Sequence, residues 1–363
     1  MTDSSMRRGW FFLWAVGCCM LPCLLSAQVK YSNAFLNLGV GARGLAMSGT
    51  QTASVSDVTA AYWNPSGLSS LDDRQQFFLM HAEYFAGMAA YDYAGWAYRM
   101  DDGQGLAVNV LRFAVDDIPN TTMLIDNQGN INYERISYFT SADWAVLLSY
   151  GRALPELAEG LSVGGSAKII RRRIGDFAGA WGFGIDLGLR YVLGEHWQFG
   201  FVAHDVTTTF NAWTHSLGEE EIEVFRRTGN ELPENGLEYT RPHFSLGAAY
   251  RTVFKDDFSA LVALDADLFC DGKRHDLLSG NTFTLDPHAG LELGYREIVF
   301  LRAGIGNFQH EAGFGDEEYT TCQVNFGVGV RIKKRVSIDY ALTDLGDVSI
   351  AVYSHLFSLK VVL

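Results

Sequence analysis

The sequence lacks the long apolar runs that cross a membrane as helices. Past residue 27, no apolar stretch of this 363-residue chain approaches the roughly 20 residues that such a helix requires. The chain is also short of positive charge, because 28 Lys and Arg residues face 42 Asp and Glu residues, for a formal net charge of −14. This balance argues against a nucleic-acid partner, which requires a basic surface.

Cysteine and catalytic motifs are scarce as well. Only Cys270 and Cys322 lie beyond the first 27 residues; they form neither a disulfide framework nor a zinc spacing, and whether they pair stays open. Residues 39–44 spell a dinucleotide fingerprint without its strand and helix. No nucleophile elbow frames a serine. Asp265 and Asp267 share one strand face and are interpreted as polar lining rather than a catalytic pair. The sequence predicts no enzyme, no cofactor and no metal site.

The first 27 residues have the composition of a secretory signal peptide. Arg7 and Arg8 supply the positive start, residues 10–25 are mostly apolar, and Ser26-Ala27 forms a small-residue cleavage site. A membrane anchor is less favoured because the apolar run is short. A lipoprotein start at Cys18 is less favoured because apolar sequence continues past it. We therefore expect an exported chain whose signal peptide is removed.

From Gln75 onward, bulky apolar residues alternate with small or charged ones, as is typical of β-strands. In residues 181–191, one face reads Trp, Phe, Ile, Leu, Leu, Tyr and the other reads Gly, Gly, Asp, Gly, Arg. A tilted strand of this length, at about 3.3 Å per residue, crosses a bilayer. The solvated face of a soluble sandwich is rich in Lys, Glu and Thr. A face of glycine and single charges instead favours a membrane barrel.

The alternation predicts an all-β protein, a 14-stranded antiparallel transmembrane barrel. The predicted strands are 75–84, 88–100, 104–115, 138–152, 160–173, 180–193, 195–208, 240–252, 256–270, 285–296, 297–308, 319–332, 334–345 and 348–363. Bulky residues would face lipid, and small or charged residues would face the lumen. The polar residues predicted to face the lumen are Asp186, Arg190, Glu292, Arg296, Arg331 and Asp339.

The connections between these strands alternate in length. Long loops are expected at 116–137, 209–239, 271–284 and 309–318, and short turns elsewhere, such as 101–103. Outer-membrane barrels have short periplasmic turns and long outer loops, so the pattern predicts the outer membrane, with both termini periplasmic. Arg171, Arg172 and Arg173 end a strand at the outer rim. They would either contact lipid phosphates or pair with the acidic loop 209–239.

The stretch before the first strand is rich in small residues and too polar to form a core alone. We expect it to pack inside the barrel as a hatch. The chain then divides into a signal peptide (1–27), an N-terminal hatch (28–73) and the barrel (74–363). The hatch ends in a motif whose residues are Trp63, Asn64, Pro65, Gly67 and Leu68.

Several of these pieces resemble the PorV/PorQ family of outer-membrane proteins. The matching segments are residues 31–36, 41–48 and 63–68, and near the end 338–344 and 354–359. The Asn64-Pro65 piece is also similar to the hatch of FadL/TodX-like transporters. The resemblance implies a FadL-like barrel with a hatch in its lumen. It also implies a role in type IX secretion, where PorV-like members carry cargo proteins by their C-terminal domains to the attachment machinery.

Three functions stay open. The main prediction is a shuttle or scaffold for type IX secretion, with the loops 116–137 and 209–239 holding the cargo. The alternative is a FadL-like transporter of hydrophobic small molecules, in which the hatch moves to open a path. The third is a soluble extracytoplasmic β-protein. The expected partners are outer-membrane lipid, cargo C-terminal domains and type IX secretion components.

Overall fold

A computed structural model describes residues 32–363 except 126–127, 271, 273, 275–277, 281–282, 313–317 and 346–352. The predicted signal peptide lies outside these described residues. None of the described helices is both long enough and apolar enough to cross a membrane.

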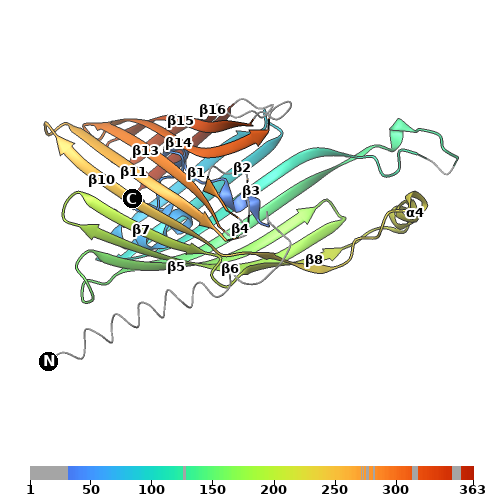
Figure 1. Cartoon of the computed structure of the whole chain (residues 1–363), viewed down its shortest axis with the longest axis horizontal. Helices are drawn as coiled ribbons and strands as arrows, with labels where there is room; N and C mark the ends of the chain where they lie inside the picture. The colour runs from blue at the N-terminus through green and yellow to red at the C-terminus, as the bar shows by residue number, and fades with distance from the viewer. Residues whose placement is uncertain are drawn as a thin grey trace.

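The chain from Gln75 onward forms one antiparallel sheet that closes on itself (Figure 1). Closure is made by the first strand against the last, from Gln76 opposite Val362 to Glu83 opposite His355. The strands are β1 (Gln75–Tyr84), β2 (Ala89–Asp101), β3 (Gln104–Asn120), β4 (Ser137–Ala153), β5 (Leu161–Ile174), β6 (Ala178–Leu193), β7 (Trp197–His204), β8 (Thr209–His215), β9 (Gly236–Thr240), β10 (His243–Phe254), β11 (Phe258–Phe269), β12 (Leu278–Ser279), β13 (Thr284–Tyr295), β14 (Val299–Ala312), β15 (Glu318–Ile332), β16 (Val336–Leu345) and β17 (Ser354–Val362).

These segments build fourteen wall strands, as predicted. The segments β7 and β8 both pair with β6 and are two halves of one wall strand. The segments β9 and β10 pair with β8 and β7 in turn and form the next wall strand. The two-residue β12 only adds to β13. The predicted all-β, antiparallel 14-stranded barrel is therefore confirmed.

The alternation of faces follows the sequence. Along β6, Leu187 and Leu189 point outward and are 50% and 39% exposed, whereas Asp186 and Arg190 point inward and are buried. One end of the barrel, the short-turn end, carries the tight turns and the paired residues Gln75 and Leu363. The other end, the long-loop end, carries the long connections.

The long-loop end has more regular structure than expected. The region predicted as an irregular loop over 209–239 contains β8, α4 (Glu219–Thr228) and β9. The alternation of bulky and small residues stops there because residues 205–208 form a turn, in which Asp205 and Thr208 have φ angles of 54° and 58°. The hairpin of β3 and β4, with η4 (Tyr133–Arg135), and α4 project beyond the barrel (Figure 1).

Residues 32–73, here called the inner segment, lie inside the barrel. Its helices are η2 (Ala34–Asn37), α2 (Ala42–Ala46), α3 (Ala60–Trp63) and η3 (Pro65–Ser70). The segment follows the wall in reverse strand order. Leu68 lies against β3 and β4, Asn64 against β6, Thr52 against β7 and β10, and Met47 against β13 and β14.

The wall meets the inner segment through glycine. A Cβ on Gly164 would lie 2.3 Å from the carbonyl carbon of Pro65, and a Cβ on Gly304 would lie 2.4 Å from that of Met47. No side chain fits at such distances, so the two backbones touch only because these positions are glycine. Nine wall strands each contribute one member to this glycine belt, which comprises Gly105, Gly151, Gly164, Gly188, Gly200, Gly247, Gly290, Gly304 and Gly327.

We expect Gly164→Ala to destabilise the barrel by about 1–3 kcal/mol, because the methyl group overpacks the contact with Pro65. Thermal unfolding of the detergent-solubilised chain measures the effect. Gly236→Ala is the control, because a Cβ there meets no atom within 4 Å and the φ of Gly236 is not positive. Equal unfolding temperatures for both variants would contradict the belt.

Candidate functional site

Asn64 fixes the inner segment to the wall. Its side-chain amide donates to the carbonyl oxygens of Thr52 (2.7 Å) and Leu189 (3.0 Å). Its side-chain oxygen accepts from the backbone nitrogen of Ser66 at 3.1 Å and so caps η3. The side chain is fully buried, and the absence of a Cβ at Gly188 leaves room for it. One asparagine thus joins two turns of the inner segment to β6.

The other motif residues shape the same corner. The Trp63 indole donates to the Val40 carbonyl oxygen at 3.0 Å. Pro65 is suited to the first turn of η3, where its missing N–H is not needed. A Cβ on Gly67 would lie 2.5 Å from the Val55 carbonyl oxygen. Leu68 is fully buried. Close packing therefore explains why each residue type stands in the motif.

Ion pairs tie the inner segment to the opposite side of the wall. Arg43 donates to Glu292 at 2.8 Å, and Glu292 also accepts from Arg302 at 2.7 Å. Asp57 pairs with Lys360 at 2.8 Å. Burial alone would raise the pKa of Asp57, but the ammonium of Lys360 holds that pKa well below its usual range. The carboxylate stays charged, and the tie persists across the physiological pH range.

The inner segment separates cavities at the two ends of the lumen. The cavity at the long-loop end has a volume of about 480 Å³. A second cavity of about 410 Å³ lies beside it, and Asp267 and His288 line both. The cavity at the short-turn end has a volume of about 340 Å³ and is lined by Arg43, Asp57 and Glu292.

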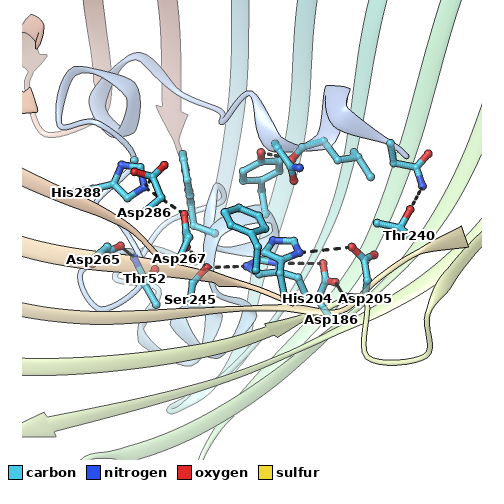
Figure 2. Close-up of a pocket in the computed structure, with 18 of the residues that line it drawn as sticks. Thr52, Asp186, His204, Asp205, Thr240, Ser245, Asp265, Asp267, Asp286 and His288 are labelled. Atoms are coloured by element: carbon cyan, nitrogen blue, oxygen red, sulfur yellow. Dashed lines mark hydrogen bonds and ion pairs between the residues drawn. The ribbon is translucent and has the colours of Figure 1, made fainter. Parts of the chain in front are cut away.

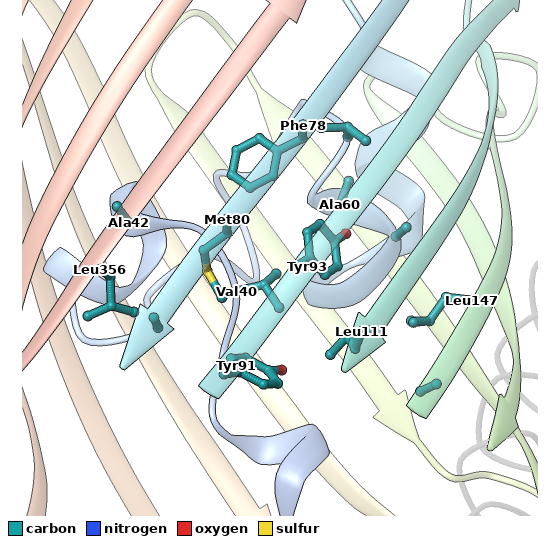
Figure 3. Close-up of a cluster of buried hydrophobic side chains, with 14 of the residues drawn as sticks. Val40, Ala42, Ala60, Phe78, Met80, Tyr91, Tyr93, Leu111, Leu147 and Leu356 are labelled. Carbon is teal, nitrogen blue, oxygen red and sulfur yellow. The ribbon is translucent and has the colours of Figure 1, made fainter. Parts of the chain in front are cut away.

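An apolar seam runs between these cavities, where the inner segment packs against β1 and β2 (Figure 3). Tyr84 lines the long-loop side and Phe78 lines the short-turn side. Met80 lies between them on the same face of β1, and Tyr91 and Tyr93 flank it from β2. All five side chains are buried. The hydroxyl groups of Tyr91 and Tyr93 have no hydrogen-bond partner among the described residues.

The long-loop cavity is polar and acidic (Figure 2). Its lining includes Asp186, Asp205, Asp265, Asp267 and Asp286, together with His204, His243 and His288. The β11 residue Asp265 faces Gly247 in the glycine belt, and its carboxylate accepts from the Thr52 backbone nitrogen at 2.9 Å. His288 lies 3.4 Å from both Asp267 and Asp286.

On the other side of this cavity, a buried lysine pairs with two of the aspartates. Lys168 from β5 lies 2.8 Å from Asp186 of β6 and also pairs with Asp205. The turn after β7 directs Asp205 inward, and its backbone nitrogen donates to Asp186 at 2.8 Å. The alternation of β5 places Lys168 inward, so its position was predictable. Its second partner was not, because Asp205 lies in an irregular turn.

The polar residues predicted to face the lumen divide into three groups. Asp186, Arg190, Glu292 and Asp339 are buried inside the barrel. Arg331 is half-exposed and lines the short-turn cavity. The prediction for Arg296 is wrong, because it lies in the turn between β13 and β14 at a φ of 53°, is 57% exposed, and pairs with Asp257 of a neighbouring turn.

The three arginines at the outer rim point in different directions. Arg172 faces the lumen, where it pairs with Asp143 at 3.0 Å and with Glu238 at 3.3 Å. Arg171 stacks over the ring of Trp181, a residue that is 60% exposed on the outer face. Arg173 is exposed and pairs with Asp176. Of the three arginines, Arg172 therefore pairs with the segment 209–239, and Arg171 and Arg173 lie on the outer face of the barrel.

The described residues contain no group of three His, Cys, Asp or Glu side chains arranged to hold a metal ion. Cys270 is buried at the end of β11 and Cys322 is half-buried in β15, and the two are not joined by a disulfide.

No protein-family model and no curated protein matches the sequence. The fold is similar to that of the CymD monoaromatic hydrocarbon channel, with a TM-score of 0.55, 14% identity, and coverage of 90% of this chain and 98% of that chain. The P. putida toluene transporter TodX is similar with a TM-score of 0.54 and 14% identity, and the match covers 90% of this chain and 99% of that chain. The Ralstonia pickettii toluene transporter TbuX is similar with a TM-score of 0.50 and 15% identity, and the match covers 90% of this chain and 98% of that chain.

The likeness extends over nearly the whole of each chain, so the chain has the predicted FadL-like barrel fold. None of their names supports the narrower PorV/PorQ resemblance, which stays a prediction.

We expect Lys168→Met to destabilise the folded chain by about 3–5 kcal/mol, because it leaves Asp186 and Asp205 buried without their cation. Chemical unfolding followed by tryptophan fluorescence measures this change. Arg173→Met is the control, because the pair of Arg173 with Asp176 is exposed and contributes little. A Lys168 variant as stable as the control would show that the buried cluster is not a structural tie.

Proposed function

We propose that this chain is an outer-membrane channel for small apolar molecules, with the inner segment acting as its hatch. The short-turn end would face the periplasm, and the signal peptide would be removed on export. The fold is that of channels whose names specify toluene or monoaromatic hydrocarbons, and we extend this substrate class to the chain. Arg171 and Arg173 on the outer face would contact lipid phosphates.

The apolar seam along β1 carries the proposal. It lies between the two lumen cavities and is formed by the packed side chains of Phe78, Met80, Tyr84, Tyr91 and Tyr93. An apolar solute moving through this seam would exchange one apolar surface for another, so it would not have to desolvate charged groups. Along nine other wall strands the boundary is the glycine belt, where the inner segment lies so close that a Cβ would not fit.

Two glycines lie in the part of the inner segment that faces the seam. Gly39 and Gly41 have φ angles of 86° and 82°, which glycine adopts without strain. The Gly39 nitrogen donates to the Tyr62 hydroxyl at 2.9 Å, and the Gly41 nitrogen lies 2.9 Å from the Met80 sulfur, a weak acceptor. Movement of residues 38–41 would break the bond from the Trp63 indole to the Val40 carbonyl oxygen and open the seam, while the Asn64 anchor stays in place.

We expect Met80→Gln to lower toluene uptake about tenfold, because the new amide can hydrogen-bond to the Gly41 nitrogen and an apolar solute would have to break that bond at a cost of roughly 1–3 kcal/mol. Met80→Leu is the control, because it keeps the seam apolar at similar volume. Uptake of radiolabelled toluene would be measured in Gram-negative cells with an intact lipopolysaccharide leaflet, with and without the protein. Uptake no faster than in cells lacking the protein would overturn the proposed function.

A second candidate is the shuttle or scaffold role in type IX secretion. The observation that favours it is the projection formed by the β3–β4 hairpin and α4, which are tied together by Arg227 donating to the Ile125 carbonyl oxygen at 3.1 Å. On this projection, which extends beyond the barrel (Figure 1), Ile125 (50%), Ile131 (58%) and Tyr133 (72%) are exposed. Exposed apolar side chains of this kind suit the capture of a cargo C-terminal domain.

If the projection binds cargo, the double variant Ile131→Asp and Tyr133→Ser should reduce co-purification of a cargo C-terminal domain about tenfold or more, since apolar anchors dominate such interfaces. Phe85→Ser is the control, because Phe85 is also exposed (47%) but lies in a different outer turn. Equal recovery of the cargo domain with both variants would discard the docking role.

A further inference from the structure

Two hydroxyl groups in the seam have no partner. Tyr91 and Tyr93 are 0% and 1% exposed, and neither hydroxyl makes a hydrogen bond within the part of the chain that the structure describes. A buried hydroxyl without a partner is costly, and a phenylalanine ring would pack in the same place without that cost. The lumen does satisfy the Tyr62 hydroxyl, which accepts from the Gly39 nitrogen at 2.9 Å and donates to the Leu36 carbonyl oxygen. The two seam hydroxyls are therefore free to bind a group that comes from outside the chain.

Apolar side chains surround both tyrosines (Figure 3). In the sheet, Tyr93 lies between Met80 of β1 and Leu111 of β3. Val40 of the inner segment belongs to the same buried cluster. The seam is therefore an apolar surface that carries unpaired hydroxyl groups. A hydrocarbon in contact with this surface leaves these hydroxyls without a bond, whereas a molecule with one polar atom on an apolar body satisfies them.

The two tyrosines follow one another along the path between the cavities. They are two positions apart on one face of β2, so their Cα atoms are about 6–7 Å apart along the strand. The Tyr91 ring lies edge-on to that of Tyr84, which lines the long-loop side. The Tyr93 ring lies edge-on to that of Phe78, which lines the short-turn side. A solute that crosses the seam therefore meets one hydroxyl after the other.

We propose that the seam selects small aromatic molecules that carry a single hydroxyl group, and that Tyr91 and Tyr93 recognise this group. The ring of the solute lies against the apolar side chains, and its hydroxyl forms a hydrogen bond with each tyrosine hydroxyl in turn. The inference rests on the proposed function, because a solute reaches these tyrosines when the seam opens. It narrows the substrate class of the channel to phenols.

The experiment measures uptake of radiolabelled p-cresol and p-xylene, which have nearly the same shape and differ by a hydroxyl group in place of a methyl group. Porin-deficient Gram-negative cells are compared with and without the protein. We expect the double variant Tyr91→Phe and Tyr93→Phe to lower the ratio of p-cresol uptake to p-xylene uptake about tenfold, which corresponds to about 1.4 kcal/mol. The reason is that the hydroxyl of p-cresol then crosses the seam without a partner.

Tyr150→Phe is the control, because the Tyr150 side chain is 43% exposed on the outer face of the wall and donates to Gln104 at 2.8 Å. We expect this variant to keep the uptake ratio of the unmodified chain.

Thermal unfolding of the detergent-solubilised double variant supplies a second test. Since neither hydroxyl is bonded within the protein, we expect the variant to unfold at a temperature no lower than that of the unmodified chain. A lower unfolding temperature, or a variant that does not fold, would show that the hydroxyls serve the folded chain and would overturn the inference.

The uptake measurements separate this inference from the proposed function. An unchanged uptake ratio in a double variant that still takes up p-xylene would overturn the inference and leave the proposed channel in place. Protein-dependent uptake of neither solute by the unmodified chain would overturn the proposed function, and the inference with it.

Discussion

The structure depends on the close contact between the inner segment and the glycine belt. A belt position that carried a side chain would push the inner segment away from the wall, because Cβ atoms there would lie 2.1–2.8 Å from its atoms. The contact lets Asn64 reach the Leu189 carbonyl oxygen and lets Asp265 accept from the Thr52 nitrogen. These bonds satisfy buried backbone groups that water cannot reach. Separation of the lumen into two cavities follows from this contact.

Much of the fold was predictable because a barrel wall imposes period two on its strands. The outward row of β6, with Leu187 and Leu189, and the inward row, with Asp186 and Arg190, follow directly from that alternation. The count of fourteen wall strands follows from the turn signals. The motif at residues 63–68 could be recognised as unusual, but its partners could not, because Leu189 is distant in sequence and Thr52 lies in an irregular part of the inner segment.

The errors arise where periodicity stops. Arg296 continues the alternation of β13 by one residue, but the strand ends at Tyr295 and the arginine falls in a turn. The segments β8 and β9 are displaced from the pattern by the turn at residues 205–208, so their continuity with β7 and β10 could not be seen in the sequence. The acidic cavity combines residues from β5, β6, β10, β11 and β13, and only closure of the barrel brings them together.

The contrast between a rigid belt and a glycine-flanked seam is the physical basis of the proposed channel. Its most direct test is hydrogen–deuterium exchange of the detergent-solubilised chain, followed by mass spectrometry. The account predicts that amides of residues 60–68 exchange as slowly as those of β4 to β6, and that amides of residues 38–41 exchange faster. Rapid exchange throughout residues 38–68, at the rate of an exposed loop, would contradict it.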